Sequence, residues 1–325
     1  MNSTVAPHPV SAPWVWTAAE LTAQTDWIVS LGNDALSEID AALAEVKKRG
    51  LPLKQITAGD FPVPSMTDAF AAISNLLSEG PGVCLLRGLP VDRYGREDTG
   101  LVLWGLGTHV GKAIAQSYRG DMIGEVMDMS HTGDTRRAYR SPLALNLHID
   151  SADVAGLLCL RRARHGGQSL VTSSFAIHNT ILAERPDLMD ILYRGYYCRH
   201  SEAADSGEDP TTPHRVPVFG QVGDRLVCNF HARPMMRSLD NDNLDTDPKA
   251  REALETFINV SESDNLVHRL MLEPGDLQFL NNRTVLHGRT EFEDYAELDR
   301  KRLILRLWLD MPQWTPLPAS MKTHA

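Results

Sequence analysis

A histidine and an aspartate separated by one residue stand near the middle of the chain and have the spacing of metal ligands. Polar and apolar residues alternate strictly over the segment LNLHID at 145–150. On a β-strand this alternation places Asn146, His148 and Asp150 on one face. Two histidines and one carboxylate on one side of a metal leave three coordination positions open, as non-haem iron oxygenases require. His148 and Asp150 would supply two of these three ligands.

A His-x-acid pair carries little information by itself. With 12 His and 42 Asp and Glu among 325 residues, composition alone gives roughly one or two such pairs by chance. A second pair, His200-Ser201-Glu202, does occur, in a polar stretch without alternation that we interpret as a loop. We therefore assign the metal to His148 and Asp150.

The third ligand is expected far downstream, on a strand that the fold brings alongside the first. His287 fits this expectation because it follows a turn at 273–276 and an apolar strand at 277–281. It also precedes Gly288, whose missing side chain permits close approach of another backbone. For His287 taken alone, the alternative to a metal ligand is a histidine with a purely structural role. The arginines that follow favour the metal site.

A late strand carries two arginines on one face. Alternation over 301–310 puts four leucines on one side, to pack against helices or a second sheet. The other side presents Arg302, Ile304, Arg306 and Trp308. An arginine on such an apolar face is tolerable only when it is paired with an anion, and guanidinium groups bind carboxylates through two parallel hydrogen bonds. The alternative is an edge strand whose arginines face water.

The surrounding elements are mainly strands, with helices in front of them. Periodicity predicts helices over 33–50, 70–80 and 97–110, with a buried strand at 83–86. Further strands are expected at 143–150, 154–161, 168–173, 215–219, 225–231, 267–272, 277–281 and 301–310, interrupted by helices at 174–192 and from 247. Many short strands with turn signals predict an antiparallel barrel or sandwich.

Length and composition indicate one globular domain. Residues 1–30, rich in Pro and Trp, are expected to form an arm on the surface or on a partner subunit, and residues 31–325 a single domain. The net charge of −10 argues against nucleic-acid binding and favours a small-molecule partner. No apolar run is long enough to span a membrane. Four widely spaced cysteines indicate reduced thiols, so a cytoplasmic protein is expected. A homo-oligomer is left open.

The motifs occur in an order that resembles one known family. The sequence has His148-x-Asp150, then Gly166-Gly167-Gln168-Ser169-Leu170-Val171-Thr172-Ser173-Ser174, then Gly275-Asp276 leading to His287, then Arg302 and Arg306. Over roughly residues 80–311 this pattern resembles the taurine/2,4-D dioxygenase (TauD/TfdA) family.

The resemblance implies a fold and a set of site residues. The fold would be mainly β with flanking helices, built on a double-stranded β-helix, or jelly-roll, core. Iron(II) would be held by His148, Asp150 and His287, with 2-oxoglutarate and O2 as cosubstrates. Thr172 and Arg302 would bind the distal carboxylate of 2-oxoglutarate, and Arg306 would face the substrate.

The reaction implied is oxidation, most often hydroxylation, of an aliphatic C–H bond in a small carboxylate or amino acid, with release of succinate and CO2. Asn146 is expected either to touch this substrate or to orient Asp150. Asn229, His231 and Arg233, which alternate along an expected strand, are further pocket candidates. The segment 111–140 matches no substrate-recognition pattern, so the resemblance does not identify the substrate.

Two alternatives remain open at this point. A zinc hydrolase also uses two histidines and a carboxylate, but it gives no role to Thr172 and Arg302 and needs a general base that the sequence does not offer. A non-catalytic jelly-roll binding protein would keep the anion pocket without turnover.

Overall fold

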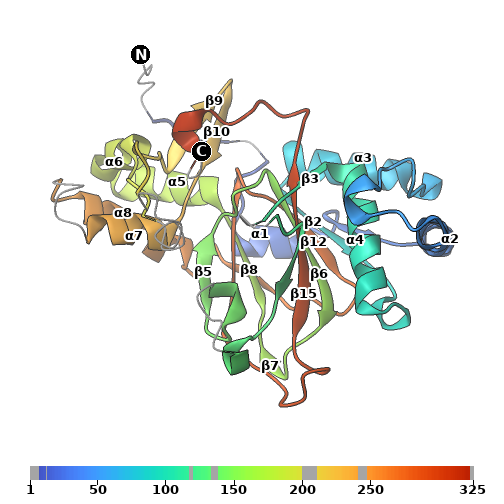
Figure 1. Cartoon of the computed structure of the whole chain (residues 1–325). Coiled ribbons are helices and arrows are strands. Elements are labelled where there is room, and N and C mark those ends of the chain that lie inside the picture. The colour runs from blue at the N-terminus through green and yellow to red at the C-terminus, as the bar shows by residue number, and fades with distance from the viewer. Residues whose placement is uncertain are drawn as a thin grey trace.

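Two β-sheets face each other at the centre of the molecule, and helices cover both outer faces (Figure 1). The computed structural model describes residues 7–11, 13–116, 120–132, 138–199, 211–240 and 247–322. Within this part of the chain the architecture confirms the predicted jelly-roll class, and the sheets are not closed; the large sheet is mixed because it contains one parallel pair.

The large sheet has the strand order β1-β2-β12-β6-β15-β3, with β4 also paired to β15. Only β1 and β2 are parallel among these pairs. The strands are β1 (Ile28–Ser30), β2 (Val83–Arg87), β3 (Lys112–Ile114), β4 (Ile123–Val126), β6 (Val154–Arg161), β12 (Leu277–Asn281) and β15 (Leu303–Asp310).

The small sheet has the order β11-β8-β13-β5 and is antiparallel throughout. Its strands are β5 (Leu145–His148), β8 (Ser169–Ser173), β11 (His268–Leu270) and β13 (Val285–Arg289). Two further pairs are β9 (Phe219–Val222) with β10 (Arg225–Cys228), and β7 (His165–Gly166) with β14 (Phe292–Glu293).

The helices form two groups on opposite sides of the sheets (Figure 1). The first group packs on the large sheet and the second on the small sheet. The first consists of α2 (Asn33–Arg49), α3 (Thr67–Ser78) and α4 (Arg96–Val110); the second consists of α5 (Ser174–Glu184), α6 (Met189–Arg194), α7 (Ala232–Leu239) and α8 (Ala250–Ser261).

The alternation of β15 determines which of its side chains reach the site. Its four leucines are buried against the first helix group, each contributing about 1.5–3 kcal/mol of burial. The opposite face of the strand turns inward between the sheets, where Ile304 joins the inner cluster and Arg306 lines a pocket. The predicted division of this strand into a leucine face and an arginine face therefore matches the structure.

Residues 13–30 pack along the seam between the two sheets. β1 extends the edge of the large sheet, and α1 (Ala18–Ala23) contacts β11 at the edge of the small sheet. Trp16, Leu21 and Trp27 are buried in the cluster between the sheets. The boundary expected at residue 30 thus falls inside the packed unit, immediately after β1.

Two predicted elements end earlier than expected. The helix expected over 174–192 is interrupted where Arg185 precedes Pro186, because a residue before proline disfavours helical backbone angles. The strand expected over 225–231 stops at Cys228, and α7 begins at Ala232. Asn229, His231 and Arg233 therefore do not alternate along one strand.

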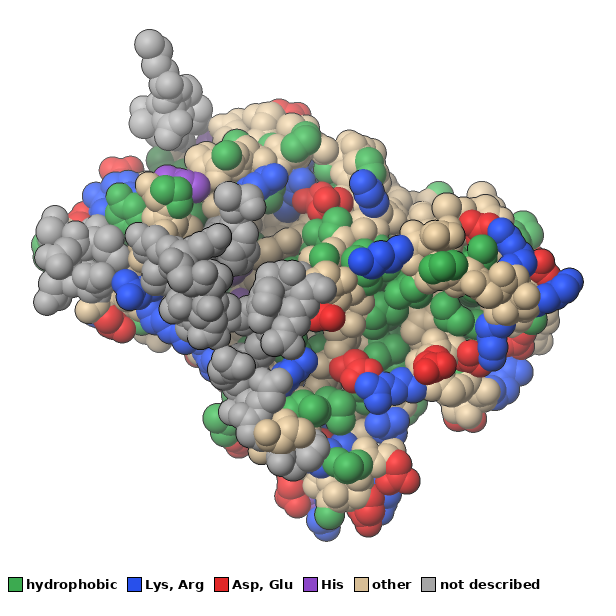
Figure 2. Space-filling view, in the orientation of Figure 1, with side chains coloured by type: hydrophobic (Ala, Val, Ile, Leu, Met, Phe, Trp, Pro, Cys, Tyr) green, Lys and Arg blue, Asp and Glu red, His purple; other side chains and the backbone are tan. Residues whose placement is uncertain are grey.

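The surface carries charges of both signs. On the face shown in Figure 2, acidic and basic side chains are interspersed over the described residues. Among the helices that the structure describes, none has both the length and the apolar character needed to cross a bilayer.

Candidate metal centre

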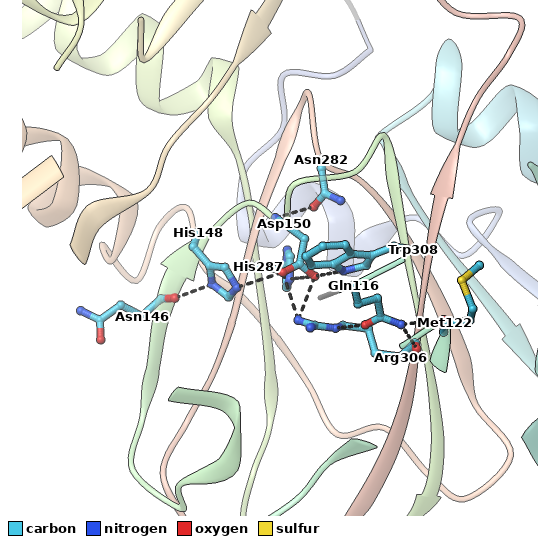
Figure 3. A network of polar contacts seen from close by, with 9 residues as sticks. All are labelled: Gln116, Met122, Asn146, His148, Asp150, Asn282, His287, Arg306 and Trp308. Carbon is cyan, nitrogen blue, oxygen red and sulfur yellow. Dashed lines mark hydrogen bonds and ion pairs between the residues drawn. The ribbon is translucent and has the colours of Figure 1, made fainter. Parts of the chain in front are cut away.

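His148, Asp150 and His287 converge at the edge of the small sheet (Figure 3). His148 on β5 and His287 on β13 are direct cross-strand partners, and their ring centroids lie 4.5 Å apart. Asp150 follows β5 immediately. Its Oδ1 lies 3.8 Å from His148 Nε2, and its Oδ2 lies 3.5 Å from His287 Nε2. One donor atom from each residue lies within 4.8 Å of the others.

Both histidines present Nε2 to the centre of this cluster. The Nδ1 of His148 lies 2.9 Å from the main-chain oxygen of Asn146, which fixes the ring and leaves Nε2 free for a metal. His287 is 5% exposed. Burial and the neighbouring His148 lower the pKa of His287, so that its imidazole is neutral, which is the form that binds metals.

Asp150 is held as an anion. Burial alone would raise its pKa, but the Arg306 guanidinium and the two histidines outweigh burial and hold the pKa well below its usual range. Arg306 Nη1 lies 3.1 and 3.3 Å from the two carboxylate oxygens, and the indole Nε1 of Trp308 donates to Oδ2 at 2.8 Å. The carboxylate is therefore ionised and oriented before any metal arrives.

Arg306 is committed to Asp150 rather than open to solvent. Its Nε donates to Gln116 Oε1 at 2.8 Å, and its guanidinium lies within 5 Å of the ring centroids of Tyr139 and Trp308. Gln116 in turn donates to the main-chain oxygen of Arg306. Only Nη2 of Arg306 has no hydrogen bond within the described ranges, so contact with the acidic group of a substrate would have to use that nitrogen.

Two buried arginines that form no ion pair with any described residue line the same pocket. Arg289 and Arg302 line it together with His148 and His287. Arg289 Nη2 donates to the carbonyls of Ser141 and Leu143, but its Nε and Nη1 are buried without a partner in the described part of the chain.

The charged forms of these two guanidiniums are disfavoured inside the protein. Burial, followed by the nearby charge of Arg302, lowers the pKa of Arg289 to about 9. Burial lowers the pKa of Arg302 to about 10. Because buried cations without a counter-ion are unfavourable, this end of the pocket fits a carboxylate.

Comparison with known proteins decides the family. The family described as "Taurine catabolism dioxygenase TauD, TfdA family" matches residues 49–308. The chain belongs to this family. Membership confirms the predicted enzyme class, a non-haem iron, 2-oxoglutarate-dependent dioxygenase, and with it the predicted cofactors. The two histidines and the carboxylate fit iron(II), and the buried arginine pair fits 2-oxoglutarate.

Relatives cover nearly the whole chain. It is 29% identical over 322 residues to FR-33289 synthase of Streptomyces rubellomurinus (strain ATCC 31215), spanning 97% of this chain and 94% of that protein. It is 28% identical over 307 residues to the taurine hydroxylase-like protein SAT17 of Stachybotrys chartarum (strain CBS 109288 / IBT 7711), spanning 90% of this chain and 77% of that protein.

Two solved structures share the fold. Asparagine oxygenase in complex with Fe(II), 2S,3S-3-hydroxyasparagine and succinate superimposes with a TM-score of 0.69 at 17% identity, covering 87% of this chain and 93% of that one. The non-heme iron oxygenase OrfP in complex with Fe and alpha-ketoglutaric acid superimposes with a TM-score of 0.66 at 16% identity, with the same coverage.

One predicted residue of this TauD-family site lies on the wrong face. Thr172 is paired with Leu286 across β13, and its hydroxyl donates to the carbonyl of Ser261 at the end of α8. It therefore points away from Arg302 and the metal cluster. His287 is paired with Val171, so odd-numbered residues of β8 face inward. Ser169 accordingly lines the pocket, where it lies directly across from Arg289 on the neighbouring strand.

Other predicted residues also lie outside the pocket. The side chain of Asn146 is exposed and points away from the metal cluster, so its main chain rather than its amide contributes, by orienting His148 (Figure 3). Asn229 donates to the main-chain oxygen of Met321, and Arg233 is exposed on α7. The pair His200 and Glu202 lies outside the described residues.

Sequence reasoning missed three inward side chains. Arg289 lies two residues after His287, and Ser169 lies two residues before Val171, the cross-strand partner of His287. Counting alternate residues from His287 along both strands would have found them. The alternation of β15 places Trp308 on the same face as Arg306, but it gives no sign of the bond from Trp308 to Asp150.

Proposed function

We propose that this dioxygenase hydroxylates an aliphatic C–H bond of a small carboxylate or amino acid, converting 2-oxoglutarate to succinate and CO2. One observation carries the proposal: a single pocket between the sheets is lined both by histidines of the metal cluster and by two buried arginines that form no ion pair with any described residue. 2-Oxoglutarate has a keto acid at one end to bind a metal and a carboxylate at the other, so it suits both ends of this pocket.

The proposed roles follow from position. His148, Asp150 and His287 hold iron(II), which when bound activates O2 and couples decarboxylation of 2-oxoglutarate to substrate oxidation. Arg289 and Arg302 bind the distal carboxylate through charge-assisted hydrogen bonds, and the Ser169 hydroxyl lies beside them. The buried walls exclude water, which strengthens these interactions.

The proposed substrate class is supported by two structural neighbours and by one cationic group of this chain. One structural neighbour, asparagine oxygenase, was solved with 3-hydroxyasparagine, and another, OrfP, with (3S)-hydroxy-L-Arg, so two proteins of this fold bind amino acids. Among the described residues that line the pocket, Arg306 offers Nη2 to a substrate carboxylate. All four cysteines are free and buried, which supports a reducing compartment such as the cytoplasm.

The test is succinate formation under air with iron(II), 2-oxoglutarate and a panel of amino acids and small carboxylates. We expect succinate and a hydroxylated product in equal amounts with at least one substrate. His287→Ala should abolish both products, whereas His165→Ala, at an exposed position on β7, should not. Iron-independent hydrolysis of a panel member would instead favour the zinc enzyme, and binding without turnover would favour the binding protein.

A further inference from the structure

The two oxygens of Asp150 have unequal surroundings. Oδ2 accepts a hydrogen bond from Trp308 Nε1 at 2.8 Å, whereas Oδ1 has Arg306 Nη1 at 3.1 Å and no contact with the indole. Both oxygens border the space between the two histidine Nε2 atoms. Arg306 donates to both oxygens, so Oδ2 accepts one hydrogen bond more than Oδ1, which leaves Oδ1 the more available to a metal.

Arg306 does not distinguish between these oxygens. Its Nη1 lies 3.1 Å from one and 3.3 Å from the other, so its charge stabilises the anion without selecting an orientation. The indole N–H of Trp308 reaches only one oxygen (Figure 3). It is a donor and cannot itself become a metal ligand.

Trp308 is well placed to hold a fixed direction. It lies on β15, where it is paired with Ala155 of β6 on one side and Ile114 of β3 on the other. A residue in the interior of a sheet has little freedom to follow the carboxylate if that group rotates. The hydrogen bond therefore resists rotation of Asp150 rather than adapting to it.

We propose that Trp308 is a positioning residue that keeps Asp150 a one-oxygen ligand of the metal, by retaining Oδ2 in a hydrogen bond. This inference rests on the proposed function. Carboxylates bind metals through one oxygen or through two. A second oxygen on the metal would occupy one of the three positions that 2-oxoglutarate and O2 require. Trp308 thus keeps coordination positions open for 2-oxoglutarate and O2, and it is not needed for binding of the metal itself.

The variant Trp308→Phe tests this role, because it removes the N–H and keeps an aromatic ring. In anaerobic titrations we expect iron(II) to bind with wild-type affinity or more tightly. The affinity of the iron-loaded protein for 2-oxoglutarate should fall about 10- to 100-fold, the value of one hydrogen bond to a charged group. The visible charge-transfer absorption of the iron and 2-oxoglutarate complex should shift or weaken.

Trp104→Phe is the matched control. Trp104 is buried on α4, and its Nε1 donates to the carbonyl of Ile56, outside the site. This variant loses an indole hydrogen bond but should keep both the absorption and the 2-oxoglutarate affinity. Wild-type affinity and absorption in Trp308→Phe would overturn the proposal, as would a loss of iron affinity alone.

A crystal structure of the wild-type protein with Mn(II) and 2-oxoglutarate tests the same point without a variant, in case Trp308→Phe does not fold. We expect one Asp150 oxygen on the metal and the other within hydrogen-bond distance of Trp308 Nε1. Two Asp150 oxygens on the metal would overturn the role of Trp308 and leave the proposed function intact. Absence of metal from the histidine pair would overturn both.

Discussion

Arg289 and Arg302 are buried and form no ion pair within the described part of the chain, and this makes their contribution depend on the cosubstrate. Replacing either by leucine should reduce 2-oxoglutarate affinity by about 100-fold, because a buried charged pair is lost. The free energy of unfolding of the ligand-free protein should stay unchanged or rise, since a costly buried charge is removed. Calorimetric titration and urea unfolding measure the two effects.

Arg300 provides the control for these variants. It is an exposed neighbour whose partner is Glu297, and Arg300→Leu should alter neither quantity by more than about 0.5 kcal/mol. If Arg289→Leu strongly destabilised the ligand-free protein and left 2-oxoglutarate binding intact, Arg289 would have a structural role only.

The opposite orientations of Ser169 and Thr172 give a second prediction. Ser169→Ala should weaken 2-oxoglutarate binding several-fold, because the Ser169 hydroxyl, which donates to Gln278 Oε1 at 2.8 Å in the ligand-free protein, can turn to donate to the carboxylate, a hydrogen bond of about 1 kcal/mol. Thr172→Val should leave that affinity unchanged, and it should lower the free energy of unfolding by about 1 kcal/mol because its bond to Ser261 is lost. Weaker binding in Thr172→Val alone would restore the assignment of Thr172 to the cosubstrate.

For single residues, the sequence predicts which side chains share a face when they belong to the same strand. His148 and Asp150 were correctly placed together because both belong to one alternating segment. The inward face of β8 depends on its register with β13, which pairs His287 with Val171. That register is a long-range property, so the family resemblance, which implied Thr172, could not show that Ser169 is the residue that faces the pocket.

At the scale of elements, the contact between α5 and α6 contains a buried histidine, His178. We expect the free energy of unfolding to depend on pH because of this residue. This histidine is fully buried, with Tyr193 Oη 2.9 Å from its Nε2. Burial lowers its pKa from the ordinary value of 6.5, and Asn179 only partly offsets this. The unfolded chain therefore takes up a proton at higher pH than the folded protein, so stability is lost as the pH falls below about 6.5.

The measurement is urea unfolding at a series of pH values between 7.5 and 5. Each such histidine contributes a slope of up to about 1.4 kcal/mol per pH unit. His268 and His287 shift in the same direction, so His178→Gln should reduce the slope without removing it. An identical slope in this variant would show that His178 does not titrate differently in the folded state.

Elements with a strong pattern were predictable, and those defined by their neighbours were not. The alternation of β15 and the periodicity of α2 follow from residues within each segment. β13 carries His287, yet it was not predicted as a separate strand, since its residues are buried on both faces and show no alternation. The stop of β10 at Cys228 likewise depends on surrounding contacts.

For the whole molecule, the N-terminal segment is part of the jelly roll. Trp16 is 3% exposed, and its Nε1 donates to the carbonyl of Pro81 at 2.9 Å. Trp16→Ala should lower the free energy of unfolding by about 3–5 kcal/mol, because it opens a cavity at the seam between the sheets. Leu143→Ala, at a side chain that is 68% exposed, should change it by less than about 0.5 kcal/mol. A small effect of Trp16→Ala would indicate that residues 13–30 are a dispensable arm.

The packing of this segment could not be predicted because its partners are distant in sequence. α1 bonds to Asn265, and Trp16 bonds to Pro81. Its own weak periodicity gives no indication of either contact. The jelly-roll class was predictable nevertheless, since it follows from many local strand and turn signals together with the order of the motifs.

The central claim is that His148, Asp150 and His287 bind iron(II) at one end of a pocket whose other end binds 2-oxoglutarate. Anaerobic addition of iron(II) and 2-oxoglutarate, followed by visible absorption, tests it most directly. We predict a charge-transfer band that requires both additions, that disappears in His287→Ala, and that needs far more 2-oxoglutarate in Arg302→Leu. A wild-type protein that gives no band, or a band that persists unchanged in both variants, would contradict the account.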